Sequence, residues 1–118
     1  MEKVRLLVEL TIPDGKLEPF NAIAEEMVAG SRAEPGTLEY EWFLSRDGKR
    51  CRLLETYTDS AALLAHFKGT VVQELVPRLA ELVAVDRFEV YGEPGPEAFA
   101  MMTPFGAEIF QRRHGLDR

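Results

Sequence analysis

Two titratable side chains near the middle of this sequence could carry acid–base chemistry, His66 and Glu55. Imidazole groups titrate close to neutral pH, so a histidine at the edge of a pocket can accept a proton under physiological conditions. His66 falls on the shoulder of the helical face that Leu63 and Phe67 define, which predicts that its ring reaches such an edge. The alternative is a half-exposed helix histidine that bonds a backbone carbonyl.

Glu55 interrupts an otherwise apolar strand face, where a hydrophobic side chain is expected. A buried carboxylate is costly unless it is paired or hydrogen-bonded. We therefore expect Glu55 to orient His66 or to hold a substrate hydroxyl. The alternative is a structural ion pair with Arg52, Arg87 or another arginine.

Three aromatic residues on neighbouring strand faces, Tyr40, Trp42 and Tyr57, could line a flat cavity. Their hydroxyl and indole groups can donate hydrogen bonds to a substrate oxygen. We predict that these three residues bind substrate, with ordinary core packing as the alternative interpretation.

Composition argues against several classes of function. The net charge is −6 and the basic residues are scattered among acidic ones, so no cationic patch is expected to bind nucleic acid. No apolar run approaches the roughly 20 residues that span a bilayer, which predicts a soluble, cytoplasmic protein without a membrane partner. Cys51 is the single cysteine and paired metal-ligand spacings are absent, so we expect no metal site.

Periodicity and turn signals predict the elements that position these residues. Alternating apolar positions indicate strands over residues 4–12, 37–45, 50–58 and 85–91. Three-to-four spacing indicates a helix over residues 17–31, a short helix that Asp59 or Ser60 caps and that ends at Phe67, and a further helical segment from Thr70 that Pro77 kinks or divides. The Asp47-Gly48 pair predicts a hairpin between the second and third strands.

This order of elements is the split βαβ arrangement of a ferredoxin-like α+β fold, in which two helices cover one face of a four-stranded antiparallel sheet. The other face carries Leu7, Phe43 and Leu54, and either Phe88 or Val90 could join them. Exposing such a patch is costly, so we predict a homodimer whose two sheets face each other as a dimeric α/β barrel.

The composition changes after Tyr91, where a Gly- and Pro-rich stretch begins. We predict one ferredoxin-like domain over residues 1–92 and a C-terminal extension over residues 93–118. The extension is too apolar for a free tail, so it should dock on its own domain or across the dimer.

Three segments carry a resemblance to a known family. The stretches Glu34-Pro35-Gly36-Thr37-Leu38-Glu39-Tyr40-Glu41-Trp42, Leu53-Leu54-Glu55-Thr56-Tyr57-Thr58-Asp59 and Ala61-Ala62-Leu63-Leu64-Ala65-His66-Phe67 resemble the antibiotic biosynthesis monooxygenase family, which includes quinol monooxygenases. The resemblance implies a dimeric α+β barrel and oxygenation of aromatic polyketides or quinols without metal, flavin or haem. Haem degradation, known in relatives of this fold, is disfavoured because Asn21 falls on the first helix and not on the first strand.

Two hypotheses of function follow. In the first, the protein is a cofactor-independent monooxygenase that acts on a quinol or polycyclic phenol, with His66 as base, Glu55 as its orienting residue and Tyr40, Trp42 and Tyr57 as the pocket wall. In the second, it is a non-catalytic dimeric barrel that binds a small apolar ligand or scaffolds a partner. Convergence of these residues on a cavity favours the first, whereas a filled core with Glu55 locked to an arginine favours the second.

Overall fold

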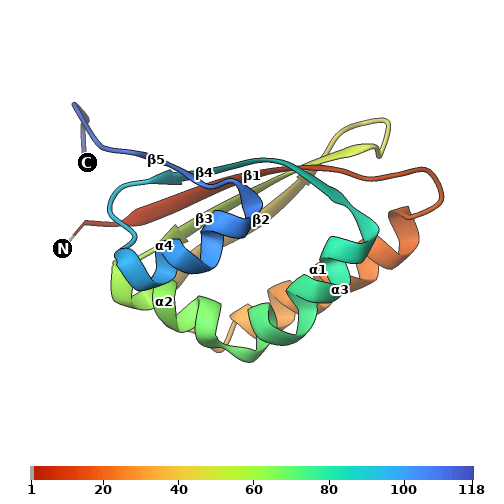
Figure 1. Cartoon of the computed structure of the whole chain (residues 1–118), viewed down its shortest axis with the longest axis horizontal. Helices are drawn as coiled ribbons and strands as arrows, with labels where there is room; N and C mark the ends of the chain where they lie inside the picture. The colour runs from red at the N-terminus through yellow and green to blue at the C-terminus, as the bar shows by residue number, and fades with distance from the viewer. Residues whose placement is uncertain (1) are drawn as a thin grey trace.

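The computed structural model describes residues 2–118, which form a sheet covered by helices on one face (Figure 1). The strands are β1 (Val4–Thr11), β2 (Thr37–Leu44), β3 (Arg50–Tyr57), β4 (Ala84–Tyr91) and β5 (Glu108–Phe110). The helices are α1 (Leu17–Ser31), α2 (Ser60–Lys68), the π-helical turn η1 (Val71–Leu75), α3 (Val76–Leu82), α4 (Pro96–Met102) and the 3₁₀ turn η2 (Thr103–Phe105). Within this described region, no helix has the length and apolarity needed to cross a lipid bilayer.

The sheet order is β2-β3-β1-β4-β5, and its first four strands are antiparallel as predicted. The α+β, ferredoxin-like fold class is therefore confirmed. The predicted strand number is wrong by one, because β5 adds a fifth strand that runs parallel to β4. β5 pairs over only three residues, and a segment so short gives no detectable alternation in the sequence.

The hydrophobic core lies between the sheet and the helices. Leu6, Val8 and Leu10 of β1 point toward the helices and are buried. The expectation that Phe88 or Val90 lies on the opposite face is wrong, because Val8 pairs with Phe88 and Leu6 with Val90 on the helix-covered side. Both β4 side chains are accordingly buried in the core.

No helix of the described residues covers the opposite face of the sheet, which we call the open face (Figure 1). Leu7 lies between Leu54 and Glu89 in the strand register, and Phe43 is paired with Arg52 one row away. The side chains of Phe43 and Leu54 are 51% and 39% exposed, so the predicted apolar positions of this face are present. They adjoin a group of charged side chains centred on Glu9.

Candidate active site

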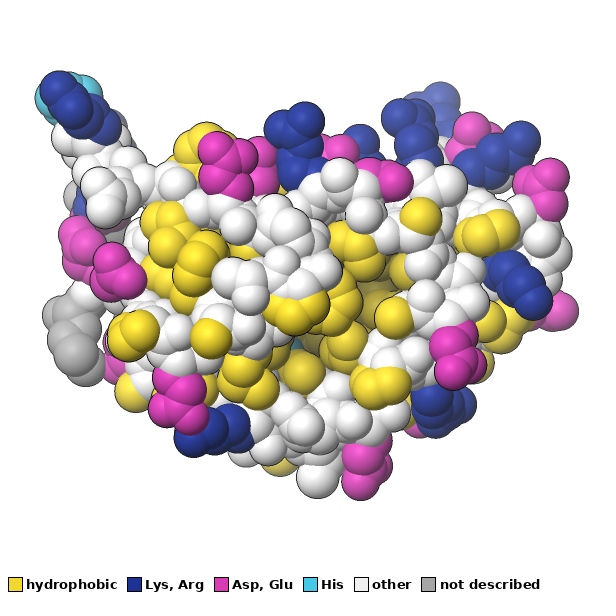
Figure 2. All heavy atoms as spheres, in the orientation of Figure 1, with side chains coloured by type: hydrophobic (Ala, Val, Ile, Leu, Met, Phe, Trp, Pro, Cys, Tyr) yellow, Lys and Arg dark blue, Asp and Glu magenta, His cyan; other side chains and the backbone are white. Residues whose placement is uncertain are grey.

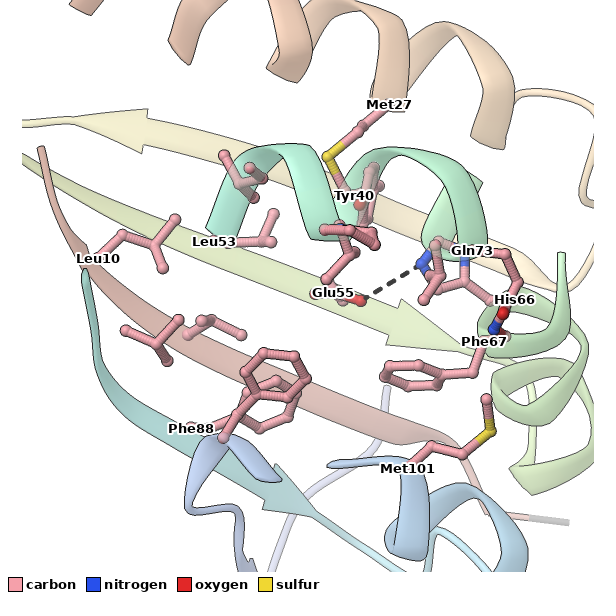
Figure 3. Close-up of a pocket in the computed structure, with 17 residues that line it drawn as sticks. Leu10, Met27, Tyr40, Leu53, Glu55, His66, Phe67, Gln73, Phe88 and Met101 are labelled. Carbon is pink, nitrogen blue, oxygen red and sulfur yellow. Dashed lines mark hydrogen bonds and ion pairs between the residues drawn. The ribbon is translucent and has the colours of Figure 1, made fainter. Parts of the chain in front are cut away.

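A cavity of about 250 Å³ lies between the covered face of the sheet and the helices. Figure 2 shows a hollow on this side of the molecule whose walls are formed by hydrophobic side chains. Its lining comes from every layer of the fold: Val8, Leu10, Met27, Tyr40, Leu53, Glu55, His66, Phe67, Val72, Gln73, Val76, Pro77, Leu79, Val85, Phe88, Met101 and Phe105. The polar members are few, and Figure 3 shows Tyr40, Glu55 and His66 at the end near α2, with Leu10 at the opposite end.

Helix α2 places His66 at this cavity. The side chain of Asp59 caps the helix by accepting a hydrogen bond from the Ala62 amide at 2.8 Å, as predicted, and this fixes where α2 begins. His66 follows in the last turn of α2 and is only 2% exposed. The alternative of a half-exposed helix histidine is therefore inconsistent with its burial.

The ring of His66 is held by a carboxylate that sequence reasoning missed. Its Nδ1 lies 2.7 Å from Oε1 of Glu34, in the loop between α1 and β2. The same oxygen accepts a hydrogen bond from the Thr37 hydroxyl at 2.8 Å, so Glu34 is itself fixed in place. Because an ionised carboxylate accepts hydrogen bonds and cannot donate them, this contact favours the form of His66 that carries a proton on Nδ1.

The loop that carries Glu34 packs closely on α2, and Gly36 makes this approach possible. A Cβ atom at Gly36 would clash with the Ala62 side chain at 2.5 Å. Any larger residue at this position would therefore force the loop to move. The Gly36 carbonyl also accepts a hydrogen bond from the Thr58 amide at 3.0 Å, just before α2. The short glycine-containing loop thus brings Glu34 within bonding distance of His66.

Glu55 faces His66 from the other side. Strand β3 places its carboxylate 4.0 Å from Nε2 of His66, the contact that is dashed in Figure 3. The Tyr57 hydroxyl donates a short hydrogen bond to the same Glu55 oxygen. Burial raises the pKa of Glu55 above its ordinary value, although His66 and the Tyr57 hydrogen bond act in the opposite direction.

No arginine neutralises Glu55 within residues 2–118. Arg52 and Arg87 both bond Glu9 on the open face, at 3.5 Å and 3.8 Å respectively. The structural ion pair that we considered for Glu55 is therefore not formed with either arginine. The carboxyl group of Glu55 instead faces a cavity, a histidine and a tyrosine hydroxyl.

The three predicted aromatic residues occupy three different positions. Tyr40 lines the cavity directly opposite Glu55 in the strand register, and its ring centroid lies 5.3 Å from that of His66. Tyr57 is fully buried behind Glu55 and does not line the cavity, while its ring also packs on His66 at 5.3 Å. Trp42 lies outside the cavity wall and packs edge-on against Phe20 and Tyr40.

Burial also sets the protonation of the two tyrosines. It raises the pKa of Tyr40 and that of Tyr57 far above the ordinary value of a phenol, and the neighbouring Glu55 charge adds to both shifts. Both side chains are therefore neutral hydrogen-bond donors at physiological pH. Among residues 2–118, no group of three or more histidine, cysteine or acidic side chains is arranged to hold a metal ion.

Comparison with known proteins gives a family and a set of similar folds. A family model described as antibiotic biosynthesis monooxygenase matches residues 3–78. The crystal structure of MupZ from Pseudomonas fluorescens superposes with a TM-score of 0.83 and 23% identity, covering 100% of this chain and 96% of that one. No curated protein matches the chain.

Two further crystal structures cover less of this chain. A conserved protein of unknown function from Bacteroides thetaiotaomicron, described as a possible oxidoreductase, aligns with a TM-score of 0.69 and 26% identity, over 75% of this chain and 94% of that one. Protein SO0527 from Shewanella oneidensis aligns with a TM-score of 0.64 and 26% identity, over 75% and 86% of the two chains.

Proposed function

This chain belongs to the antibiotic biosynthesis monooxygenase family, and we propose that it is a cofactor-independent monooxygenase that oxidises a quinol or polycyclic phenol with dioxygen. The observation that carries this proposal is the arrangement around His66. Its Nδ1 is bound by Glu34 at 2.7 Å, while its Nε2 faces Glu55 at the polar end of an apolar cavity.

In this proposal His66 is the base that deprotonates the substrate. Since Glu34 binds the Nδ1 side, Nε2 is free to accept a proton from a phenolic hydroxyl placed at this end of the cavity. The Glu34 carboxylate also stabilises the positive imidazolium that forms. In other histidine-dependent sites, a carboxylate bound to the second ring nitrogen has the same effect. Glu34 thus takes the orienting role that the sequence suggested for Glu55.

Glu55 and Tyr40 would hold the substrate hydroxyl. Burial raises the pKa of Glu55, so its carboxyl group is more readily protonated here than in water and can then donate a hydrogen bond. Tyr40 lies directly across the strand register from it and remains a neutral O–H donor. In this proposal both groups donate to the substrate oxygen and stabilise the phenolate as its charge develops in an apolar cavity.

The oxidation balances without an outside reductant. The phenolate gives one electron to dioxygen, and the resulting radical pair forms a carbon–oxygen bond, so that a hydroperoxide results. Loss of water from this hydroperoxide, with the proton returned from His66, leaves a new carbonyl group on the ring. A quinol and dioxygen thereby give a hydroxyquinone and one water, and the substrate supplies all four electrons.

We further propose that the protein is a homodimer joined through the open face of the sheet. Leu7, Leu54 and Phe43 form the apolar part of this face, and the side chains of Leu54 and Phe43 are exposed to solvent. A two-fold axis would bury each patch against its own copy. The carboxylates and arginines beside the patch could pair across such an interface, because both signs of charge occur there.

Oxygen consumption by metal-free, flavin-free protein tests the activity. The substrates are a panel of hydroquinones and anthrone-like phenols, and an enzyme-free blank corrects for autoxidation. We expect uptake above the blank, and we expect His66→Ala to lower it by roughly a hundredfold. His114→Ala is the matched control, since His114 is exposed and lies in the C-terminal tail.

Rates equal to the blank across the whole panel would overturn the monooxygenase proposal. Binding of the same compounds without oxygen uptake would then favour a non-catalytic barrel that holds a small apolar ligand. An equal loss of activity in His66→Ala and His114→Ala would overturn the role of His66 as base.

A further inference from the structure

We propose that the segment from α4 to η2 (residues 96–105) is the wall that determines which ring systems the cavity accepts, with Phe105 as the specificity-determining side chain. This inference deepens the proposed function, because it rests on the same cavity holding a hydroxylated aromatic molecule. It concerns residues that lie beyond the part of the chain that the family model matches, which ends at residue 78.

The segment contributes two side chains to the cavity, Met101 of α4 and Phe105 of η2. Both are half-buried, whereas Gln73 and Pro77, on the η1–α3 side, line the cavity and are also exposed to solvent. The mouth therefore lies between the C-terminal segment and the η1–α3 region. Removing the segment would leave the cavity open along this side.

Anchors on both sides of Phe105 hold the wall in place. On the α4 side, Ala98 and Met102 are buried, and Glu97 bonds Lys68 of α2 at 2.6 Å. On the other side, β5 pairs with β4, and the Gly92 amide bonds the Phe110 carbonyl at 3.0 Å. Because the backbone is fixed at both ends, shortening a side chain between them should enlarge the cavity and not collapse the wall.

Phe105 lies across the cavity from the polar groups. Its ring stacks on Phe88 at a centroid distance of 6.0 Å and an interplanar angle of 20°. Figure 3 shows Phe88 on the side of the cavity opposite His66. A ring system whose hydroxyl lies beside His66 and that extends across the cavity meets Phe88 and Phe105, so the size of Phe105 limits how far it can extend.

The lining also defines the charge of the molecule that fits. No lysine or arginine lines the cavity in the described part of the chain, and Glu55 is its one acidic group. A carboxylate or phosphate would lose its hydration there without gaining a lysine or arginine as a partner, which disfavours its binding. The ligand class is therefore an uncharged aromatic hydroxyl compound, whose number of fused rings Phe105 restricts.

Binding under argon separates this inference from the oxidation chemistry. The probes are phenol, 1-naphthol and 1-anthrol, which share one hydroxyl and differ in ring number, and Kd is measured by calorimetry. We define the Kd ratio as the Kd of 1-anthrol divided by the Kd of phenol. We expect Phe105→Ala to lower this ratio by at least about tenfold, because the larger cavity favours the three-ring probe. Phe105→Leu, which retains an apolar side chain if the alanine variant fails to fold, should shift it in the same direction by less.

Phe110→Ala is the matched control. Phe110 belongs to the same C-terminal segment but stacks on Tyr91 outside the cavity, at a centroid distance of 5.5 Å. We expect its Kd ratio to stay within about twofold of the parent protein. Three outcomes would each overturn the inference. They are an unchanged Kd ratio in both Phe105 variants, an equal shift of this ratio in Phe110→Ala, and no binding of any probe to the parent protein.

The two proposals fail in different ways. A shifted Kd ratio in protein that consumes no oxygen would support the specificity wall and overturn the monooxygenase. Oxygen consumption with an unchanged Kd ratio would overturn the specificity wall alone.

Discussion

Two glutamates on opposite faces of this sheet have pKa values shifted in opposite directions. On the open face, Glu89 of β4 accepts hydrogen bonds from the Tyr91 hydroxyl at 2.5 Å and from Arg87 at 3.1 Å, and these contacts lower its pKa. On the covered face, Glu55 of β3 has a histidine and a tyrosine as neighbours, and burial raises its pKa. The same residue type on the same sheet is thus stabilised as an anion on one face and disfavoured as an anion on the other.

This difference distinguishes Glu89, a structural carboxylate, from Glu55, whose protonation could change during the proposed reaction. A glutamate beside an arginine keeps its charge over the physiological range. A buried glutamate without a cation is costly to the fold, and such costs are concentrated at functional sites. The contrast predicts that substitutions on the covered face change activity, whereas substitutions on the open face change assembly.

After His66→Ala, the largest effect is expected from Glu34→Gln. The amide keeps the size of the side chain but removes the charge that stabilises the His66 imidazolium across the 2.7 Å contact. We expect kcat to fall by about 10- to 100-fold. KM should change little, because Glu34 does not line the cavity. Steady-state oxygen uptake over a range of substrate concentrations measures both parameters.

Glu39→Gln is the control for this prediction. Glu39 accepts a hydrogen bond from Thr56 at 2.6 Å on the neighbouring strand and has no contact with His66. Equal losses of kcat in the two variants would contradict a specific role for Glu34. An increase in KM at constant kcat would instead indicate that Glu34 contacts the substrate.

The next effect is expected on the open face, from Leu54→Asp. Leu54 lies opposite Leu7 in the register, and a charge there would have to be buried in the proposed dimer. We expect the dimer Kd, measured by analytical ultracentrifugation, to rise by at least about tenfold. Leu44→Asp is the control, because Leu44 is exposed but pairs with Cys51 in the row that belongs to the covered side. A monomeric parent protein would contradict the proposed assembly.

The fold could be predicted because its signals are local. Each signal acts within a few residues: alternation in the strands, three-to-four spacing in the first helix and the Asp47-Gly48 turn. Together they predict the order of strands and helices along the chain up to β4. Strand β5 could not be predicted, because three residues are too few for a period. The orientation of Phe88 and Val90 depends on register with β1, which alternation alone does not specify.

The site was less predictable because its contacts are long-range. Glu55 was identifiable as a carboxylate that breaks an apolar strand face. Glu34 is 32 positions before His66, and in the sequence it belongs to a Glu-Pro-Gly turn that only indicates the end of a helix. Trp42 shares a strand face with Tyr40, but the cavity ends before it. Strand alternation predicts which face a residue occupies and not how far a cavity extends across that face.

A smaller effect, on stability, is expected from Glu55→Gln. The folded pKa of Glu55 lies above the ordinary value of 4.5, so between these two values the folded protein binds one more proton than the unfolded chain. Stability must therefore fall as the pH rises through this window. Glutamine carries no charge at any pH, so the variant should lose this dependence and melt several degrees higher at pH 8, at about 4 °C per kcal/mol.

Thermal unfolding at pH 4 and pH 8 measures the effect of Glu55→Gln. Glu39→Gln again serves as the control, because its carboxylate is exposed on the open side of β2. A variant that melts lower than the parent protein at pH 8 would show that Glu55 stabilises the fold, and would remove the contrast between the two faces.

The smallest effect is expected at the margin of the covered face, from Trp42→Phe. The indole N–H of Trp42 is buried and has no hydrogen-bond partner within residues 2–118, a situation that costs about 1–3 kcal/mol. Phenylalanine removes this donor but also loses apolar contact with Phe20, so the two changes oppose each other. We expect a melting temperature within about 3 °C of the parent protein and unchanged oxygen uptake.

Tyr40→Phe, two residues away on the same strand, removes the hydroxyl of a side chain that lines the cavity and should lower kcat. Equal losses of kcat in the two variants would mean that the functional part of the covered face extends to the edge of β2.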